Sequence, residues 1–128
     1  MKKTEDKRQK RYDLQSRLID FAISVIRLIE KLPNTRVGNH IANQLVKSGT
    51  SPAANYGEAQ GSESRSDFIH KIRIVLKELR ETLVWLLIIQ RLALIKPAES
   101  IGSIIAENNE LISIFVSSIG TAQKGESH

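Results

Sequence analysis

The sequence predicts an all-α protein, a left-handed four-helix bundle with up-down-up-down topology. Apolar residues recur at helical intervals through most of the 128 residues, and Pro33, Gly61 and Pro97 interrupt that recurrence at three places. A domain of this length buries about two thirds of the surface of its unfolded chain, so a single core is sufficient. We expect the bundle to cover residues 12–120, with helices at about 13–32, 35–60, 66–95 and 97–119.

The first predicted helix has the most regular apolar pattern. Its core positions follow one another at intervals of three and four residues and are Leu14, Leu18, Phe21, Val25, Leu28 and Leu32. Asp13 stands at the start, where a carboxylate favours the free amides of the first turn, and Pro33 should end the helix at Leu32. Before this helix, residues 1–11 offer no apolar side chain after Met1, so we expect a disordered basic arm.

The second predicted helix contains a proline. One apolar face continues through it at helical spacing, formed by Val37, Ile41, Leu45, Ser48, Pro52, Tyr56 and Ala59. Asn34 and Thr35 are both suitable N-cap residues. Pro52 has no amide hydrogen for the Ser48 carbonyl and its ring crowds that carbonyl, so we expect a kink there. We interpret the kink as a packing feature rather than as a ligand site.

The third predicted helix follows the turn at Gly61, and Ser66 is its expected N-cap. Between Leu83 and Ile89 the helix is apolar on nearly all sides. A bundle helix needs only one buried face, so this excess predicts contact with another subunit.

The fourth predicted helix begins with Pro97, which fits the first helical position, and ends at Gly120. Asn108 falls on its apolar seam. A polar residue there selects register or oligomeric state, unless it faces solvent at a splayed end of the bundle. Residues 121–128 are polar, and we expect a frayed tail.

Charge and composition exclude several classes of protein. The net charge is +5, of which residues 1–11 contribute +4, so the folded part is nearly neutral. The chain has no cysteine, which excludes disulfides and thiolate metal sites. No signal-peptide pattern is found, and the longest apolar run, Leu83 to Ile89, is much shorter than the roughly 20 residues of a membrane span. We therefore expect a cytoplasmic protein without membrane contact.

The motifs of common catalytic sites are missing from the sequence. A di-metal bundle needs two carboxylate-x-x-His pairs, and Asp67 to His70 is the single example here. There is no nucleophile motif and no phosphate-binding glycine loop. We predict no catalytic residues, no metal and no cofactor, and hence no enzymatic activity.

Two groups of basic residues are candidates for binding nucleic acid. The arm contains Lys2, Lys3, Lys7, Arg8, Lys10 and Arg11. The third helix carries the second group at intervals of 3, 4 and 3 on one polar face: His70, Arg73, Lys77 and Arg80. Such a row suits a phosphate backbone. The alternatives are a solvated helix face and a tail that serves only solubility.

The sequence also resembles a known family. The matching segments are DLQSRLIDFA (13–22), LP (32–33), IANQLVKSGTS (41–51), ANYGEA (54–59), SRSDFIHK (64–71) and LKELRETLVWL (76–86). Together, over about residues 12–118, they resemble the 23S rRNA intervening-sequence proteins, small bacterial four-helix bundles. Recurrent family positions, without a catalytic role there, are matched by Asn55, Glu58, Asp67, Lys77, Glu78, Glu81 and Trp85. We expect these residues to hold the kink and the subunit contacts, with Trp85 as a packing or interface anchor.

The resemblance implies partners as well as a fold. The family is encoded within sequences inserted in 23S rRNA genes or elsewhere in bacterial genomes. Its fold is similar to that of the accessory protein of diversity-generating retroelements, a basic pentamer that binds nucleic acid and a reverse transcriptase. The resemblance therefore implies a homopentameric ring and RNA as the first partner to test.

We expect, in sum, a ring that binds structured RNA or an RNA-protein assembly through the arm and the third helix. One alternative is a structural oligomer that recruits a protein such as a reverse transcriptase. A metal enzyme is the third.

Overall fold

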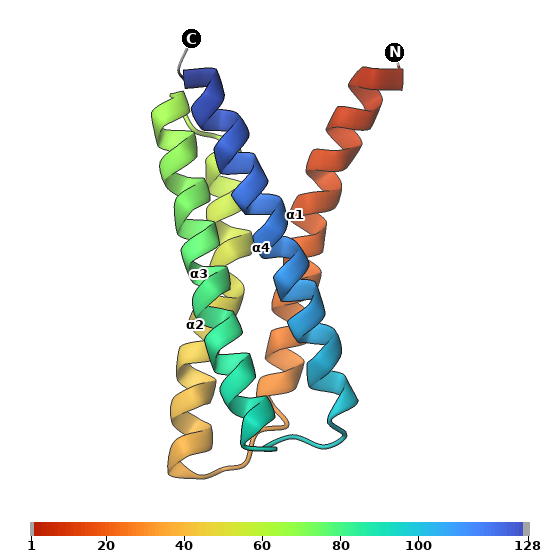
Figure 1. The fold of residues 1–128 in the computed structure, drawn as a ribbon, viewed down its shortest axis with the longest axis vertical. Helices are drawn as coiled ribbons and strands as arrows, with labels where there is room; N and C mark the ends of the chain where they lie inside the picture. Colours follow the sequence, from red (N-terminus) through yellow and green to blue (C-terminus); the bar gives the residue numbers. More distant parts are fainter. Residues whose placement is uncertain (1, 127–128) are drawn as a thin grey trace.

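The computed structural model describes residues 2–126, and the side chains of residues 13–124. Its helices are α1 (Lys2–Ile29), α2 (Arg36–Gln60), α3 (Arg65–Arg91) and α4 (Glu99–Glu126). Each helix packs against the next in the sequence, α1 also contacts α4, and successive helices run in opposite directions (Figure 1). The predicted all-α up-down bundle of four helices is confirmed.

A single apolar core lies between the four helices, because each contributes the seam that the sequence pattern indicates. The largest fully buried apolar side chains are Leu18 and Val25 of α1, Leu45 of α2, Ile72, Val75, Leu79, Leu86 and Ile89 of α3, and Ile101, Leu111 and Phe115 of α4. Gly49 of α2 lies against Val25 of α1, where an added Cβ would come within 2.6 Å of a Val25 methyl group. The missing side chain therefore lets these two helices approach closely.

The connection between α1 and α2 is longer than predicted, because α1 ends earlier. α1 ends at Ile29 rather than Leu32, and the amide of Leu32 donates to the Ile29 carbonyl, three residues back, at 3.0 Å. This hydrogen bond closes a 3₁₀-type turn, which is narrower than an α-helical turn. Leu32 precedes Pro33, and a residue before proline is disfavoured in the α-helical conformation. Thr35, one of the two predicted N-caps, caps α2: its hydroxyl accepts from the Gly38 amide at 3.0 Å.

The N-cap of α3 is Ser64, so the prediction of Ser66 was wrong by two residues. The backbone of Ser64 is extended, and its hydroxyl accepts from the Asp67 amide at 3.0 Å. This cap adds Arg65 to the first turn and leaves Asp67 near the positive end of the helix dipole.

α3 also ends earlier than predicted, at Arg91 rather than residue 95. Ala93 adopts a left-handed conformation with φ 52°. The Leu94 amide then donates to the Ile89 carbonyl and the Ala93 amide to the Gln90 carbonyl, both at 3.1 Å. These are the two hydrogen bonds of a Schellman motif. Glycine usually occupies the left-handed position of this motif, and alanine there costs about 1 kcal/mol. This helix end was therefore not predictable from the sequence.

α4 begins at Glu99, so the assignment of Pro97 to the first helical position was wrong. Pro97 lies before the helix, and its carbonyl accepts from the amide and the hydroxyl of Ser100. The helix continues through Gly120 to Glu126, because Gly120 has no positive φ and a single glycine costs a helix only about 1 kcal/mol. The predicted frayed tail is therefore helical up to residue 126.

The N-terminal arm also differs from the prediction of disorder. The backbone of residues 2–11 belongs to α1, and this part of the helix diverges from the other three (Figure 1). Lysine, arginine, glutamate and glutamine, which are good helix formers, make up eight of the ten residues 2–11. The arm side chains lie outside the described residues. The kink at Pro52, which lies inside α2, and the left-handed twist stay predictions.

The corrected N-cap of α3 gives a matched test. Ser64→Ala removes the acceptor of the Asp67 amide and should lower the free energy of unfolding by about 1 kcal/mol. Ser66→Ala is the control, because Ser66 is exposed within the first turn and should change stability by less than about 0.5 kcal/mol. Urea unfolding followed by circular dichroism measures both. Equal losses in the two variants would contradict the assignment of Ser64.

Candidate nucleic-acid interface

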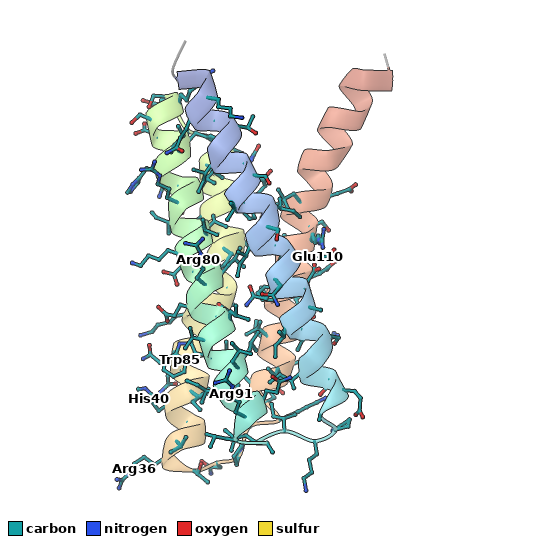
Figure 2. The ribbon with its side chains drawn as sticks, in the orientation of Figure 1. Arg36, His40, Arg80, Trp85, Arg91 and Glu110 are labelled. Carbon is teal, nitrogen blue, oxygen red and sulfur yellow. The ribbon has the colours of Figure 1, made fainter. Side chains whose placement is uncertain are left out.

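The predicted basic residues of α3 form a row on its outer face. His70, Arg73, Lys77 and Arg80 are all exposed, and none forms an ion pair among the described side chains. We call these four residues the basic stripe. Helical spacing continues the same face to Arg91, which is also exposed (Figure 2). Arg91 was not predicted from the sequence. It follows Arg80 by eleven residues, which is three helical turns, and this spacing could have indicated it.

The acidic residues of α3 lie beside the stripe, on the flank that meets α2. Trp85 contacts His40 of α2 edge-to-face, with ring centroids 5.8 Å apart, and its indole nitrogen donates to Glu81 at 3.2 Å. These contacts place Glu81 on the flank that meets α2. Asp67 and Glu78 share that flank by helical spacing. The acidic residues thus border the stripe on its α2 side, where Glu81 is four residues from Lys77, and no ion pair joins the two groups among the described side chains.

Two acidic residues in the middle of α4, Glu107 and Glu110, are also directed away from the stripe. Arg17 of α1 donates from Nε and Nη2 to the two carboxylate oxygens of Glu107, each at 2.7 Å, and from Nη2 to Glu110 at 2.7 Å. Hydrogen bonding to Glu107 holds the pKa of Arg17 above its ordinary value. Glu110 lies on the side of α4 that faces α1 (Figure 2). This bidentate ion pair joins α1 to α4, where both carboxylates have a partner.

Glu78 is the titratable group of α3 that its environment perturbs. Partial burial raises its pKa, the neighbouring Glu81 raises it further, and Lys77 acts in the opposite direction. Its main-chain carbonyl accepts from the Thr82 hydroxyl at 2.8 Å, while its carboxylate forms no ion pair with a described side chain. Glu78 and Glu81 thus form a pair of like charges beside the α2–α3 contact.

The remaining family-motif residues have structural contacts. Asn55 donates to the Ser51 carbonyl at 3.0 Å and to the Ser51 hydroxyl at 2.8 Å, next to Pro52, so its amide braces this part of α2. Glu58 lies 3.5 Å from the Lys71 ammonium and joins α2 to α3. Trp85 is half-buried and packs against the core. The structure gives each of these residues a contact within the chain.

Metal and membrane sites were also considered. Within residues 13–124, no group of three histidine or acidic side chains is placed to hold a metal ion. His128 lies outside the described residues. No helix in the described part of the chain is long and apolar enough to cross a membrane.

Comparison with known proteins places the chain beside one family and beside solved structures. The family described as 23S rRNA-intervening sequence protein matches residues 10–117. A protein of unknown function from the S23 ribosomal protein family of Bacteroides thetaiotaomicron has a similar crystal structure, with 34% sequence identity and a TM-score of 0.76. The likeness covers 83% of this chain and 97% of that one. Among proteins with curated descriptions, none matches the sequence.

The raised pKa of Glu78 predicts a pH dependence of stability. The folded state holds this proton more tightly than the unfolded chain, so stability falls as pH rises from the ordinary value of 4.5 to the raised value. Glu78→Gln has no such proton. Its stability relative to wild type should therefore increase through this window and then level off, as measured by urea unfolding from about pH 4 to pH 8.

The control uses Glu81, which contributes to the raised pKa of Glu78. In a Glu81→Gln background, the stability difference caused by Glu78→Gln should be smaller. A difference that does not change with pH would contradict the perturbation of Glu78.

Proposed function

Because the chain belongs to the 23S rRNA-intervening sequence protein family, we propose that it binds structured RNA, or an RNA-protein assembly, through the basic stripe of α3 and without catalysis. The observation that carries the proposal is the exposed row of basic side chains on α3. Arg73, Lys77 and Arg80 are exposed and unpaired among the described side chains, while the acidic residues of the helix lie on the α2 flank. The basic arm at the start of α1 is the second proposed contact.

The geometry of the stripe favours contact with phosphates over contact with bases. Arg73 and Arg80 lie about 10 Å apart along the helix axis, from the helical rise of 1.5 Å per residue. A straight row of guanidinium groups suits the phosphates of a regular backbone. The row contains no aromatic side chain, and Trp85 belongs to the α2 flank. Stacking of unpaired bases, which single-strand binding requires, therefore has no platform here.

RNA binding tests this proposal. Arg73→Ala/Lys77→Ala/Arg80→Ala should weaken binding to a structured rRNA fragment and reduce the slope of log affinity against log salt by about 2 to 3, because three phosphate contacts are lost. Fluorescence anisotropy over a salt series measures both effects. A deletion of residues 1–11 measures how much the arm contributes to the RNA affinity and to the salt slope.

The control removes the same charge elsewhere. The variant Arg27→Ala/Lys31→Ala/Lys47→Ala changes three exposed basic residues outside the stripe. They belong to α1, to the α1–α2 connection and to α2, respectively. It should leave the slope closer to that of wild type. Failure of the wild-type protein to bind structured RNA or duplex DNA at low salt would contradict the proposal and favour an oligomer that recruits a protein partner, such as a reverse transcriptase.

We further propose that the chain assembles as a ring, with five subunits as the number that the family resemblance implies. Two exposed apolar surfaces support assembly. The α1 patch consists of Ile19, Ile23 and Ile26, which are 40–46% exposed. The α3 patch consists of Val84, Ile88 and Leu92 at the C-terminal end of α3. Val84 is 54% and Leu92 56% exposed, and Ile88 between them is partly buried against the core. Exposed apolar surfaces of this kind mark contact sites.

The two patches lie on different helices, and α1 and α3 do not pack directly against each other. An interface in which the α1 patch of one copy meets the α3 patch of the next joins unlike surfaces. Such a head-to-tail contact produces a ring when the rotation closes, whereas a two-fold dimer uses the same surface twice. The arrangement of the patches therefore favours a ring over a symmetric dimer.

Single charges in either patch test the head-to-tail contact. Ile23→Glu and Val84→Glu should each convert the oligomer to monomers in light scattering coupled to size-exclusion chromatography. Val116→Glu, an exposed apolar residue of α4 outside both patches, is the control and should leave the mass unchanged.

Mixing the two patch variants distinguishes the type of interface. Each variant retains the patch that the other has lost, so a mixture should form a dimer through one intact interface. A mixture that stays monomeric, or a Val116→Glu variant that also dissociates, would contradict the proposed contact.

A further inference from the structure

A polar side chain lies unpaired in the middle of the core. Asn108 of α4 is fully buried, and neither its Oδ1 nor its Nδ2 has a hydrogen-bond partner among the described residues. The two other buried polar residues each donate within their own helix: Ser48 to the Leu45 carbonyl at 3.5 Å and Thr82 to the Glu78 carbonyl at 2.8 Å. A buried amide with no partner is costly, so the surroundings of Asn108 need a chemical explanation.

The contact between two aromatic rings fixes the level of Asn108 relative to α2. Tyr56 of α2 meets Phe115 of α4 edge-to-face across the core, with ring centroids 5.7 Å apart. α2 and α4 run in the same direction (Figure 1). Asn108 precedes Phe115 by seven residues, and Gly49 precedes Tyr56 by seven residues. In a helix this separation is two turns along the same face. Asn108 therefore lies at the level of Gly49.

The backbone of α2 is unusual at this level. Pro52 has no amide hydrogen, so the Ser48 carbonyl lacks the donor that a helix normally supplies four residues later. Ser48, Gly49 and Pro52 are all buried, and Gly49 packs directly against Val25 of α1. An acceptor without its helical donor and an amide without a partner thus share one level of the core.

We propose that Asn108 binds one internal water molecule, which links its side-chain amide to the main-chain carbonyl of Ser48. The water accepts a hydrogen bond from Nδ2 of Asn108 and donates one hydrogen to the Ser48 carbonyl. Its second hydrogen is donated to the Ser48 hydroxyl oxygen, which retains a free lone pair while its own hydrogen points to Leu45. Three polar partners are typical of a buried structural water. The site is independent of the proposed function, because it lies inside a single chain.

The first test detects the water directly. In nuclear magnetic resonance spectra of the full-length protein labelled with nitrogen-15, the side-chain amide of Asn108 should show a cross-relaxation peak to a long-lived water molecule. Asn108→Leu identifies the Asn108 signal by its loss. The exposed Asn109 should show no such peak, and Asn109→Leu identifies its signal as the matched control. Absence of the water peak from Asn108 in the folded wild-type protein would overturn the proposal.

The second test measures the link to Pro52. Pro52→Ala supplies an amide to the Ser48 carbonyl and so replaces the water as its donor. In the Asn108→Leu background this carbonyl has lost its water, so Pro52→Ala should raise the folding equilibrium constant by about fivefold or more relative to its effect in the wild-type background. The same effect in both backgrounds, within about twofold, would show that Asn108 and the Ser48 carbonyl are not linked.

Discussion

The burial of four apolar seams against one another determines which face of each helix is left for function. On α3, Ile72, Val75, Leu79 and Leu86 must face the core, so the side chains on the opposite side of the helix must meet solvent or a partner. The basic stripe lies on that opposite side. The α2 flank is already occupied by the contact of Trp85 with His40 and by the ion pair of Glu58 with Lys71. Packing therefore decides which charges are free to bind and which join helices.

Helical spacing was sufficient to predict the helices, the core and the stripe, because all three depend on residues three or four positions apart. The helix ends were less predictable. Ser64 and Ser66 have the same capping chemistry, and only the backbone conformation distinguishes them. Ala93 ends α3 in a conformation that usually signals glycine, and the packed turn that follows tolerates its cost. These are choices that tertiary structure makes between locally similar alternatives.

Long-range pairs were not predictable from the sequence. Arg17 lies ninety positions from Glu107, and nothing in the local sequence of α1 indicates that its guanidinium meets two carboxylates of α4. The same limit applies to Asn108. Its place on the apolar seam was evident, but burial or exposure at a splayed end depended on where α1 leaves the bundle. α1 diverges from the other helices at its N-terminal part (Figure 1), whereas Arg17 of α1 still contacts Glu107 and Glu110 on either side of the buried Asn108.

The basic stripe and the α3 patch occupy successive halves of one helix face, and this order has a consequence for assembly. His70 to Arg80 form the N-terminal half of the face, and Val84 to Leu92 the C-terminal half. In the proposed ring the apolar half is covered by the neighbouring subunit, while the basic half stays exposed beside each junction. Every subunit would then present its stripe at the same height. A row of weak phosphate contacts repeated around a ring acts at high effective concentration, so a stripe of only three permanent charges can support useful affinity when RNA spans several subunits.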